Sequence, residues 1–380
     1  NVTYNQYLMA GKDLAYYQKG GIIMTKKLMF IAFLASLFTG SVAMSEGFKL
    51  GGKPNPALVI FSQTNDGGWS QALDEARLRV EAELGLKIPV VQNIPENATA
   101  IRPAVELLID RGHNIIIGSA FGYSDTFLEL AGEHPDVAFL NPAGTTNSAN
   151  LQSFYGRTYE SQYLCGMVAG GLTKTNKIGF VGANPFGLVN WTVNAYLLGA
   201  RKVNPNAQLT VVFTGAWNDP VKERAAAEAL IEQGIDVIGQ HVDTPTPQIV
   251  AEEKGVYGTG HHRDFSEFSS ATQCSSAWVW EEYLVPEINK IVAGDWEPNP
   301  WGAFLSIKDG GTDAVGFGSA VSDDLKAQVM AERDAIMAGK HVYAGPIIDA
   351  DGTVRVAAGE VLGDGDIWAM DWFVSGVTSQ

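Results

Sequence analysis

The stretch from Ser62 to Gln71 carries residue types that could hold a flat ligand in an otherwise polar loop. Gly67 and Gly68 allow a sharp backbone turn, and Ser70 is a candidate N-cap for a following helix. Next to them lies Trp69, whose large apolar face could stack on a planar ring. The alternative is that Trp69 only fills the rim of a core.

Other aromatic and polar residues also follow apolar runs that are predicted to be strands. Rings at matching turns could sandwich a flat ligand, and Trp69 with Trp191 is the best pair, each face contributing about 0.5–1.5 kcal/mol beyond burial. Asp125 could accept from ring N–H or amino groups, or could instead cap a helix. Asn190 and Asp264 could bond the ligand's edge. The candidate ligand-binding residues are Phe61, Trp69, Ser70, Phe121, Tyr123, Asp125, Asn190, Trp191, Trp217, Asp243, His262 and Asp264.

Catalytic and metal-binding patterns were also sought. The chain has no Gly-x-x-x-x-Gly-Lys loop, Gly-x-Ser-x-Gly elbow or Cys-x-x-Cys pair, so we expect neither an enzyme nor a cofactor. His241, His261 and His262 could in principle bind a metal. Adjacent side chains of a regular strand point to opposite faces, however, so we expect no metal site here. We expect His262 to form a hydrogen bond in a hinge or cleft.

An alternation of strands and helices should position these residues. Corresponding strands of two sets are about 120 residues apart, and residues 107–118 resemble residues 229–240. Predicted strands lie at 58–61, 88–92, 114–118 and 137–141, then at 177–181, 209–213, 236–240 and 256–260. Predicted helices lie at 70–85, 99–112, 124–133, 189–203, 219–234 and 246–254, with tail helices at 278–292 and 325–338.

Such βαβ repeats require parallel sheets with right-handed crossovers. The predicted fold class is therefore α/β, with two similar doubly wound parallel-sheet lobes joined by a multi-strand hinge. The N-terminal lobe is predicted at 55–157 plus about 262–307. The C-terminal lobe is predicted at 158–261 plus about 308–380.

The N-terminal part resembles a targeting segment. Residues 24–27 are a basic start, residues 28–38 are an apolar run too short to span a bilayer, and small residues follow. We interpret 24–45 as a secretory signal peptide cleaved near Ala43 or Ser45, and 1–23 as upstream read-through. No cysteine lies near that point, so no lipid anchor is expected. The product should be periplasmic and soluble after cleavage.

The composition and net charge of the chain limit the classes of partner that it can bind. Of 380 residues, 46% are hydrophobic and 18% charged, which is typical of a globular protein. The formal charge of −16 disfavours nucleic acid and anionic membranes as partners, because both would repel it. Cys165 and Cys274 could pair in an oxidising compartment or remain as buried free thiols.

Several ordered motifs resemble one family. Residues 65–71, 120–125 and 156–166 are similar to the glycine turn, the Gly-Phe-x-x-Ser-Asp element and the Phe-Arg-x-x-Glu-x-x-Tyr-Leu-x-Gly signature of the basic membrane protein (BMP) family. Further similarity lies at 177–182, 262–264 and 308–311, so the resemblance covers about 55–375. The family comprises type I periplasmic substrate-binding proteins of ABC transporters and includes purine-nucleoside receptors.

The resemblance implies a receptor, expected to be a monomer, that closes on a small ligand and delivers it to an ABC permease. Trp69 stands where the family has a stacking Phe, Ser70 where it has Asn, and Trp191 or Thr192 where a second Phe is expected. More aromatic bulk and fewer sugar-binding acids favour a flat purine-type ligand such as adenine. A purine nucleoside or riboflavin receptor, a sensor for a membrane kinase, and a secreted nucleoside-processing hydrolase remain as alternatives.

Overall fold

The computed structural model describes residues 47–380, which form one compact unit. The predicted signal peptide at 24–45 and the predicted read-through at 1–23 lie outside the described residues. No helix within 47–380 is both long and apolar enough to cross a membrane.

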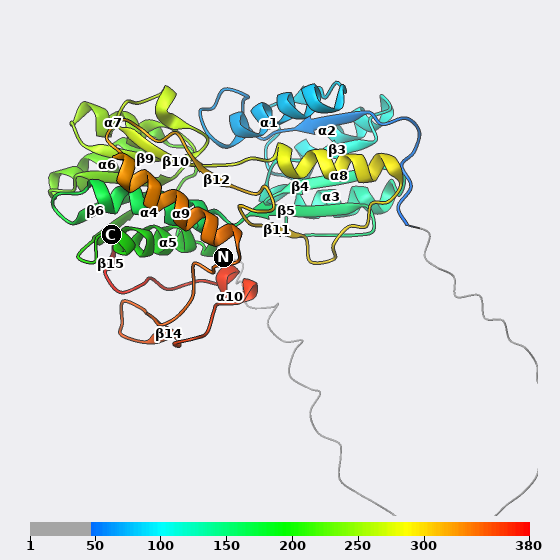
Figure 1. Cartoon of the computed structure of the whole chain (residues 1–380). Helices are drawn as coiled ribbons and strands as arrows, with labels where there is room; N and C mark the ends of the chain where they lie inside the picture. The colour runs from blue at the N-terminus through cyan, green and yellow to red at the C-terminus, as the bar shows by residue number, and fades with distance from the viewer. Residues whose placement is uncertain (1–46) are drawn as a thin grey trace, which may run out of the picture. The chain divides into compact units, whose positions relative to one another are not determined.

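The described chain is built on two separate sheets, each forming one lobe (Figure 1). Every strand pair of the first sheet is parallel, and in the second sheet only β12 runs antiparallel to its neighbour. In sheet order, the first sheet is β11 (Ala303–Leu305), β5 (Leu151–Gly156), β4 (Ala138–Pro142), β3 (Ile115–Ile117), β1 (Pro56–Val59) and β2 (Val90–Val91). The second sheet is β12 (Asp313–Val315), β10 (Thr272–Ala277), β9 (Tyr257–His262), β8 (Val237–His241), β6 (Lys177–Gly182), β7 (Gln208–Phe213) and β15 (Val377–Ser379).

Helices cover both faces of each sheet, as parallel strands require. In the first lobe α1 packs against α8 and α2 against α3, and in the second α4 packs against α5 and α9, and α6 against α7. The first-lobe helices are α1 (Trp69–Leu84), α2 (Ala98–Asp110), η1 (Phe121–Tyr123), α3 (Ser124–Glu133) and α8 (Glu281–Ala293). The second-lobe helices are α4 (Thr158–Leu172), α5 (Gly187–Val203), α6 (Pro220–Glu232), α7 (Thr246–Glu253), η2 (Phe265–Glu267) and α9 (Asp323–Met337). The tail adds β13 (Ile347–Ile348), β14 (Val354–Val356) and α10 (Asp364–Trp368).

Local sequence explains why these elements form. The strand β3 is three consecutive buried isoleucines, the continuous β-branched run expected of a central parallel strand. Asn97 caps α2 by accepting from the backbone N–H of Ala100, and Asp219 caps α6 by accepting from that of Lys222. The largest hydrophobic cluster runs through both lobes, so their cores are continuous along one face.

The chain crosses between the two sheets three times, at 156–158, 277–281 and 305–313. The crossings pack tightly on one another. A Cβ placed on Gly156 would lie 2.6 Å from the carbonyl oxygen of Gly311 and 2.7 Å from a ring carbon of Trp278. Gly156 therefore allows the three segments to form one hinge, and Trp278 belongs to that hinge.

The predicted fold class is confirmed: the chain is α/β, with two parallel-sheet lobes. One predicted crossing between the lobes lies later in the sequence than expected, because β10 belongs to the second sheet. Strand β10 pairs with β9 in the second sheet, whereas the sequence placed the return to the first lobe at about 262. The sequence Thr272–Ala277 has no apolar alternation, so it was not recognised as a strand although all six residues are buried. The strand β5 and the helix α4 were also not assigned, and the helix predicted at 278–292 begins only at Glu281.

Cys165 and Cys274 form a disulfide that joins α4 to β10, with their Cα atoms 5.6 Å apart. Both residues are fully buried. Of the two states left open by the sequence, the structure contains the disulfide.

This bond closes a loop of 109 residues, so removing it should enlarge the conformational freedom of the unfolded chain. We expect the Cys165→Ala/Cys274→Ala variant to lose about 2–5 kcal/mol of unfolding free energy in denaturant titrations. Adding reductant should move the wild type toward the variant and leave the variant unchanged. Identical unfolding curves under all four conditions would contradict the structure.

Candidate ligand-binding site

The loop between β1 and α1 is organised by Asp66. Its Oδ1 accepts from the backbone N–H groups of Gly68 (2.9 Å) and Gln71 (3.0 Å), and its Oδ2 accepts from that of Ser70 (3.1 Å). The prediction that Ser70 caps the helix is wrong, because α1 already begins at Trp69 and Asp66 binds the free N–H groups. The Ser70 hydroxyl oxygen is buried and has no hydrogen-bond partner among the described residues.

This loop of the first lobe touches the loop after β8 in the second lobe. A Cβ on Gly68 would lie 1.8 Å from the backbone oxygen of Asp243, and one on Gly67 would lie 2.9 Å from Cδ of Pro245. Gly67 also has a φ of 83°, a left-handed conformation that glycine adopts without strain. The two lobes are therefore in contact, and we call the boundary between these two loops the seam.

An ion pair also crosses between the lobes. Arg263 follows β9 in the second lobe, and its Nη2 lies 2.5 Å from Glu75 Oε1 on α1. The same guanidinium pairs with Glu267 and lies over the ring of Phe268 at 5.1 Å. Because Arg263 is largely buried, this contact is less screened than a surface ion pair and favours the closed arrangement.

Trp69 lies behind the seam within a box of aromatic rings and is only 7% exposed. Its Nε1 donates to the backbone oxygen of Ser119 at 2.6 Å. Its ring stacks with Tyr155 at a centroid distance of 6.2 Å and meets Trp278 edge-to-face at 5.3 Å. The indole is thus held by a hydrogen bond at one edge and by rings around it, which makes it a rigid wall.

Trp191 is placed differently from the prediction. It is fully buried, its Nε1 donates to Thr158 Oγ1 at 3.0 Å, and its ring meets Trp368 at 4.8 Å. The predicted sandwich of Trp69 and Trp191 is not formed in the described chain. Tyr155 contacts both rings instead, at 6.2 and 6.1 Å.

A buried polar pair lies beside Trp69. His262 Nε2 is 3.0 Å from Asp243 Oδ1, and Trp278 Nε1 donates to His262 Nδ1 at 2.9 Å. The prediction that His262 forms a hydrogen bond in the hinge or cleft is confirmed. His262 has a φ of 77°, a conformation that costs free energy for a side chain with a Cβ and is concentrated at functional sites.

Burial governs the electrostatics around this pair. It raises the pKa of Asp243, which the hydrogen bond from His262 opposes. It holds the pKa of His241 and of His261 well below the usual value, so both imidazoles stay neutral. Burial also raises the pKa of Glu223, which accepts from the Thr244 hydroxyl, to about 7.

The three histidines lie closer together than a regular strand would allow. The ring centroids of His241 and His261 are 4.0 Å apart, and those of His261 and His262 are 4.3 Å apart. The expectation that adjacent side chains diverge is wrong here, because the left-handed backbone at His262 ends the regular strand. Even so, no group of three or more His, Cys, Asp or Glu side chains in the described region could hold a metal ion.

The remaining predicted residues fall into two groups. Trp217 is half-buried near the seam, and its ring lies 5.8 Å from His241 and 6.4 Å from Phe186. The others are engaged elsewhere or face solvent. Phe61 is half-buried, Phe121 and Asp125 are exposed, Tyr123 donates to Ile94, Asn190 donates to Met370, and Asp264 caps η2 by accepting from Ser266. The structure thus brings together Trp69, Ser70, Asp243 and His262, with Trp217 adjoining.

Sequence reasoning missed three rings of this site. Tyr155, Trp278 and Trp368 are not among the candidate ligand-binding residues predicted from the sequence. Tyr155 and Trp278 belong to the hinge, where chain segments far apart in sequence meet. Tyr155 directly precedes the 156–166 motif, which is the one signal that could have found it.

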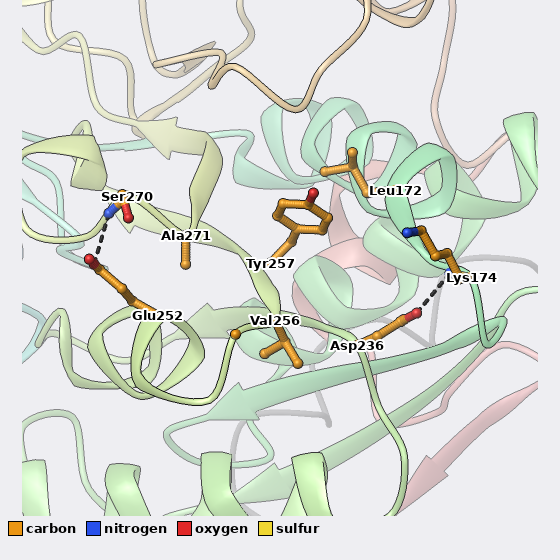
Figure 2. A pocket seen from close by; sticks show the side chains of 9 residues that line it. Leu172, Lys174, Asp236, Glu252, Val256, Tyr257, Ser270 and Ala271 are labelled. Carbon is orange, nitrogen blue, oxygen red and sulfur yellow. Dashed lines mark hydrogen bonds between the residues drawn. The ribbon is translucent and has the colours of Figure 1, made fainter.

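A separate hollow of about 370 Å³ lies on the second lobe (Figure 2). The residues that line it lie around the amino ends of β8 and β9, whereas the seam lies at the carboxyl ends of these strands. Its polar groups are already paired: Asp236 accepts from the backbone of Lys174, and Glu252 accepts from that of Ser270. Ligands of α/β sheets bind at the carboxyl ends of strands, so we assign the candidate site to the seam.

Two parallel-sheet lobes joined by three crossings define the two-lobed α/β fold of periplasmic binding proteins. Residues 53–343 match the Bmp family, described as ABC transporter substrate-binding protein PnrA-like. The chain belongs to this family and is a substrate-binding protein of an ABC transporter, not an enzyme.

Individual relatives agree with this assignment. The chain is 30% identical to a purine-binding protein of Brucella abortus over 88% of this chain and 98% of the relative. It is 32% identical over 82% of this chain and 80% of the relative to a Haloferax volcanii protein whose name provisionally assigns it to glucose binding in an ABC transporter. A solved solute-binding protein of Conexibacter woesei superposes with a TM-score of 0.64 at 23% identity, over 75% of this chain and 97% of that one. It supports the fold alone.

We expect Gly68→Ala to hold the lobes apart, because its Cβ would meet a backbone oxygen across the seam rather than a movable side chain. In small-angle X-ray scattering, the variant should show a larger radius of gyration than the wild type. Gly132→Ala, on the open surface of α3 with no atom within 4 Å of its Cβ, is the matched control and should scatter as the wild type does. Equal radii for all three proteins would contradict the proposed contact.

Proposed function

We propose that this protein is the extracytoplasmic receptor of an ABC importer for a flat purine-type base, adenine or a close relative. The ligand would bind at the seam, the lobes would close on it by hinge motion, and the closed receptor would deliver it to a membrane permease. The observation that carries the proposal is the aromatic wall of Trp69 beside the Ser70 hydroxyl, which has no partner among the described residues.

The chemistry of the seam supports a flat heterocycle. Small-molecule sites are mostly apolar, with a few well-placed polar groups that fix the ligand's orientation. Here the apolar part consists of ring faces, which suit a planar ligand better than a sugar. The polar part is the Asp243 carboxyl group, whose Oδ1 bonds His262, and Ser70 Oγ, which is buried without a partner in the described chain.

The relatives, the predicted signal peptide and the family also support a purine-type ligand, export from the cytoplasm and a permease as partner. The Brucella abortus protein is named as purine-binding and is similar over nearly its whole length. The signal peptide predicted at 24–45 supports export from the cytoplasm. Membership in a family of ABC transporter substrate-binding proteins supports a permease as the partner.

Isothermal titration calorimetry tests the ligand class directly. The panel is adenine, hypoxanthine, guanine, adenosine, riboflavin and glucose. We expect a purine base to bind most tightly and adenosine to bind more weakly, because the rings of the hinge leave little room for a ribose. No heat with any heterocycle, or heat with glucose alone, would overturn the proposal. Native mass spectrometry of the purified protein would identify a ligand retained from the cell.

We expect Trp69→Ala to weaken binding of the preferred base at least tenfold, because the variant loses both a stacking face and buried apolar area. The variant should still fold, with a lower melting temperature, since the indole is also part of the core. Trp301→Ala is the control, because Trp301 is 91% exposed and should leave the affinity unchanged. Unchanged affinity in Trp69→Ala would place the ligand elsewhere.

We expect Ser70→Ala to move stability and affinity in opposite directions. The hydroxyl is buried without a partner, so removing it should leave the ligand-free protein as stable or up to about 1 kcal/mol more stable. The affinity should fall about fivefold, because the hydrogen bond to the ligand is lost. Ser124→Ala is the comparison, since Ser124 Oγ donates to Phe121 and its loss should only destabilise. Full affinity in Ser70→Ala would exclude this hydroxyl from the site.

A further inference from the structure

We infer that Trp278 is a positioning residue whose indole N–H fixes one neutral tautomer of His262, so that Asp243 is held as an acceptor for an N–H group of the ligand. The inference rests on the proposed function for the identity of the ligand. The part that concerns Trp278 and His262 can be tested without any ligand.

Hydrogen-bond chemistry fixes the direction of each bond. An indole Nε1–H can only donate, so the Nδ1 atom of His262, 2.9 Å from Trp278 Nε1, must be the unprotonated ring nitrogen. The proton of a neutral imidazole is then on Nε2, which lies 3.0 Å from Asp243 Oδ1 and donates to it. A second proton, placed on Nδ1, would point at the indole N–H.

The backbone holds the two rings in this relation. Ala277 is the register partner of His262 in the β9–β10 pair, and the Trp278 backbone N–H donates to the His262 carbonyl at 3.0 Å. The two rings are close to parallel, with an interplanar angle of 28°. The left-handed φ of His262 turns its ring toward Trp278 and Asp243, which gives the strained conformation a specific role.

The tautomer of His262 determines how Asp243 can bind a ligand. Asp243 Oδ1 is occupied by the His262 N–H, which leaves Oδ2 as the oxygen that would accept from a ligand. A carboxylate oxygen accepts hydrogen bonds and repels other acceptors. The site therefore selects neutral heterocycles that present an amino or ring N–H group, and rejects ligands that present a carboxylate or phosphate there.

Several other groups face His262 and could titrate beside it. His241 and His261 stay neutral because burial holds the pKa of each well below its usual value. Glu223, whose pKa is raised to about 7 by burial, titrates in wild type and variants alike, so only differences between variants are informative. The charged and titratable groups around the pair are Asp66, Glu75, Tyr155, Glu223, His241, Asp243, His261 and Arg263.

Trp280 provides a matched control. It stacks on Trp278 with ring centroids 4.4 Å apart and an interplanar angle of 12°, and it is fully buried. Its Nε1, however, has no hydrogen-bond partner among the residues that the structure describes. Trp278→Phe and Trp280→Phe thus remove similar indole bulk, but only the first removes a bond to His262.

The first experiment is ¹⁵N NMR of the histidine rings at pH 8, with His262 assigned by comparison with His262→Gln. In the wild type and in Trp280→Phe, we expect His262 as the Nε2–H tautomer. In Trp278→Phe, Nδ1 no longer accepts the indole N–H, so the Nδ1–H tautomer should become populated. If Trp278→Phe does not fold, the wild-type spectrum decides, because an Nδ1–H tautomer there would overturn the inference.

The second experiment compares adenine affinities of the variants at pH 8. In Trp278→Phe the His262 tautomer is no longer fixed, so Asp243 Oδ1 loses its constant donor and the carboxyl group is held less firmly. Affinity should be at least threefold lower in Trp278→Phe than in Trp280→Phe. Trp278→Phe/His262→Gln should recover part of this loss, because a Gln amide can donate to Asp243 without depending on a tautomer.

The outcomes separate the two proposals. Equal adenine affinities in Trp278→Phe and Trp280→Phe would overturn the inference and leave the proposed function intact. No binding of any purine by the wild type would overturn the proposed function, and the NMR comparison alone would then decide the role of Trp278.

Discussion

The closed arrangement depends on the approach of two backbones at Gly68 and Asp243. A single added methyl group on Gly68 would lie 1.8 Å from a carbonyl oxygen of the other lobe, so no other residue fits. This approach removes water from the seam, and dehydration raises the pKa of Asp243 and strengthens every polar contact nearby. The electrostatics of the site therefore follow from one close contact between the lobes.

The hinge and the candidate site share the same aromatic residues. Tyr155 is the penultimate residue of β5, just before the first crossing, and Trp278 directly follows β10 in the second crossing. Both contact Trp69, so a change in the angle between the lobes must move rings that form the wall of the site. Packed aromatic rings adopt discrete arrangements rather than deforming continuously. Hinge motion and the shape of the site are coupled for this reason.

The sequence predicted what depends on local pattern. Apolar runs such as Ile115–Ile117 and the repeat at 229–240 predicted two doubly wound lobes, and glycines with a tryptophan predicted the loop before α1. Strand β10 could not be recognised, because it lacks apolar alternation and some of its polar side chains are paired with residues far away in sequence, such as Ser276 with Ser161. The roles of Tyr155 and Trp278 depend on where crossings meet, and the left-handed conformation of His262 has no signal in residue type.

A buried polar atom of the seam can link binding to closure. Trp69, Tyr155 and Trp278 contact one another and so hold the wall on which a flat ligand would stack. The hydroxyl of Ser70 is buried without a partner among the described residues. An unsatisfied buried hydroxyl costs about 1–3 kcal/mol, and a ligand that bonds it recovers that amount in the closed form alone. A shift from 1% to 99% closed requires about 5.5 kcal/mol, so this hydrogen bond supplies part of that difference.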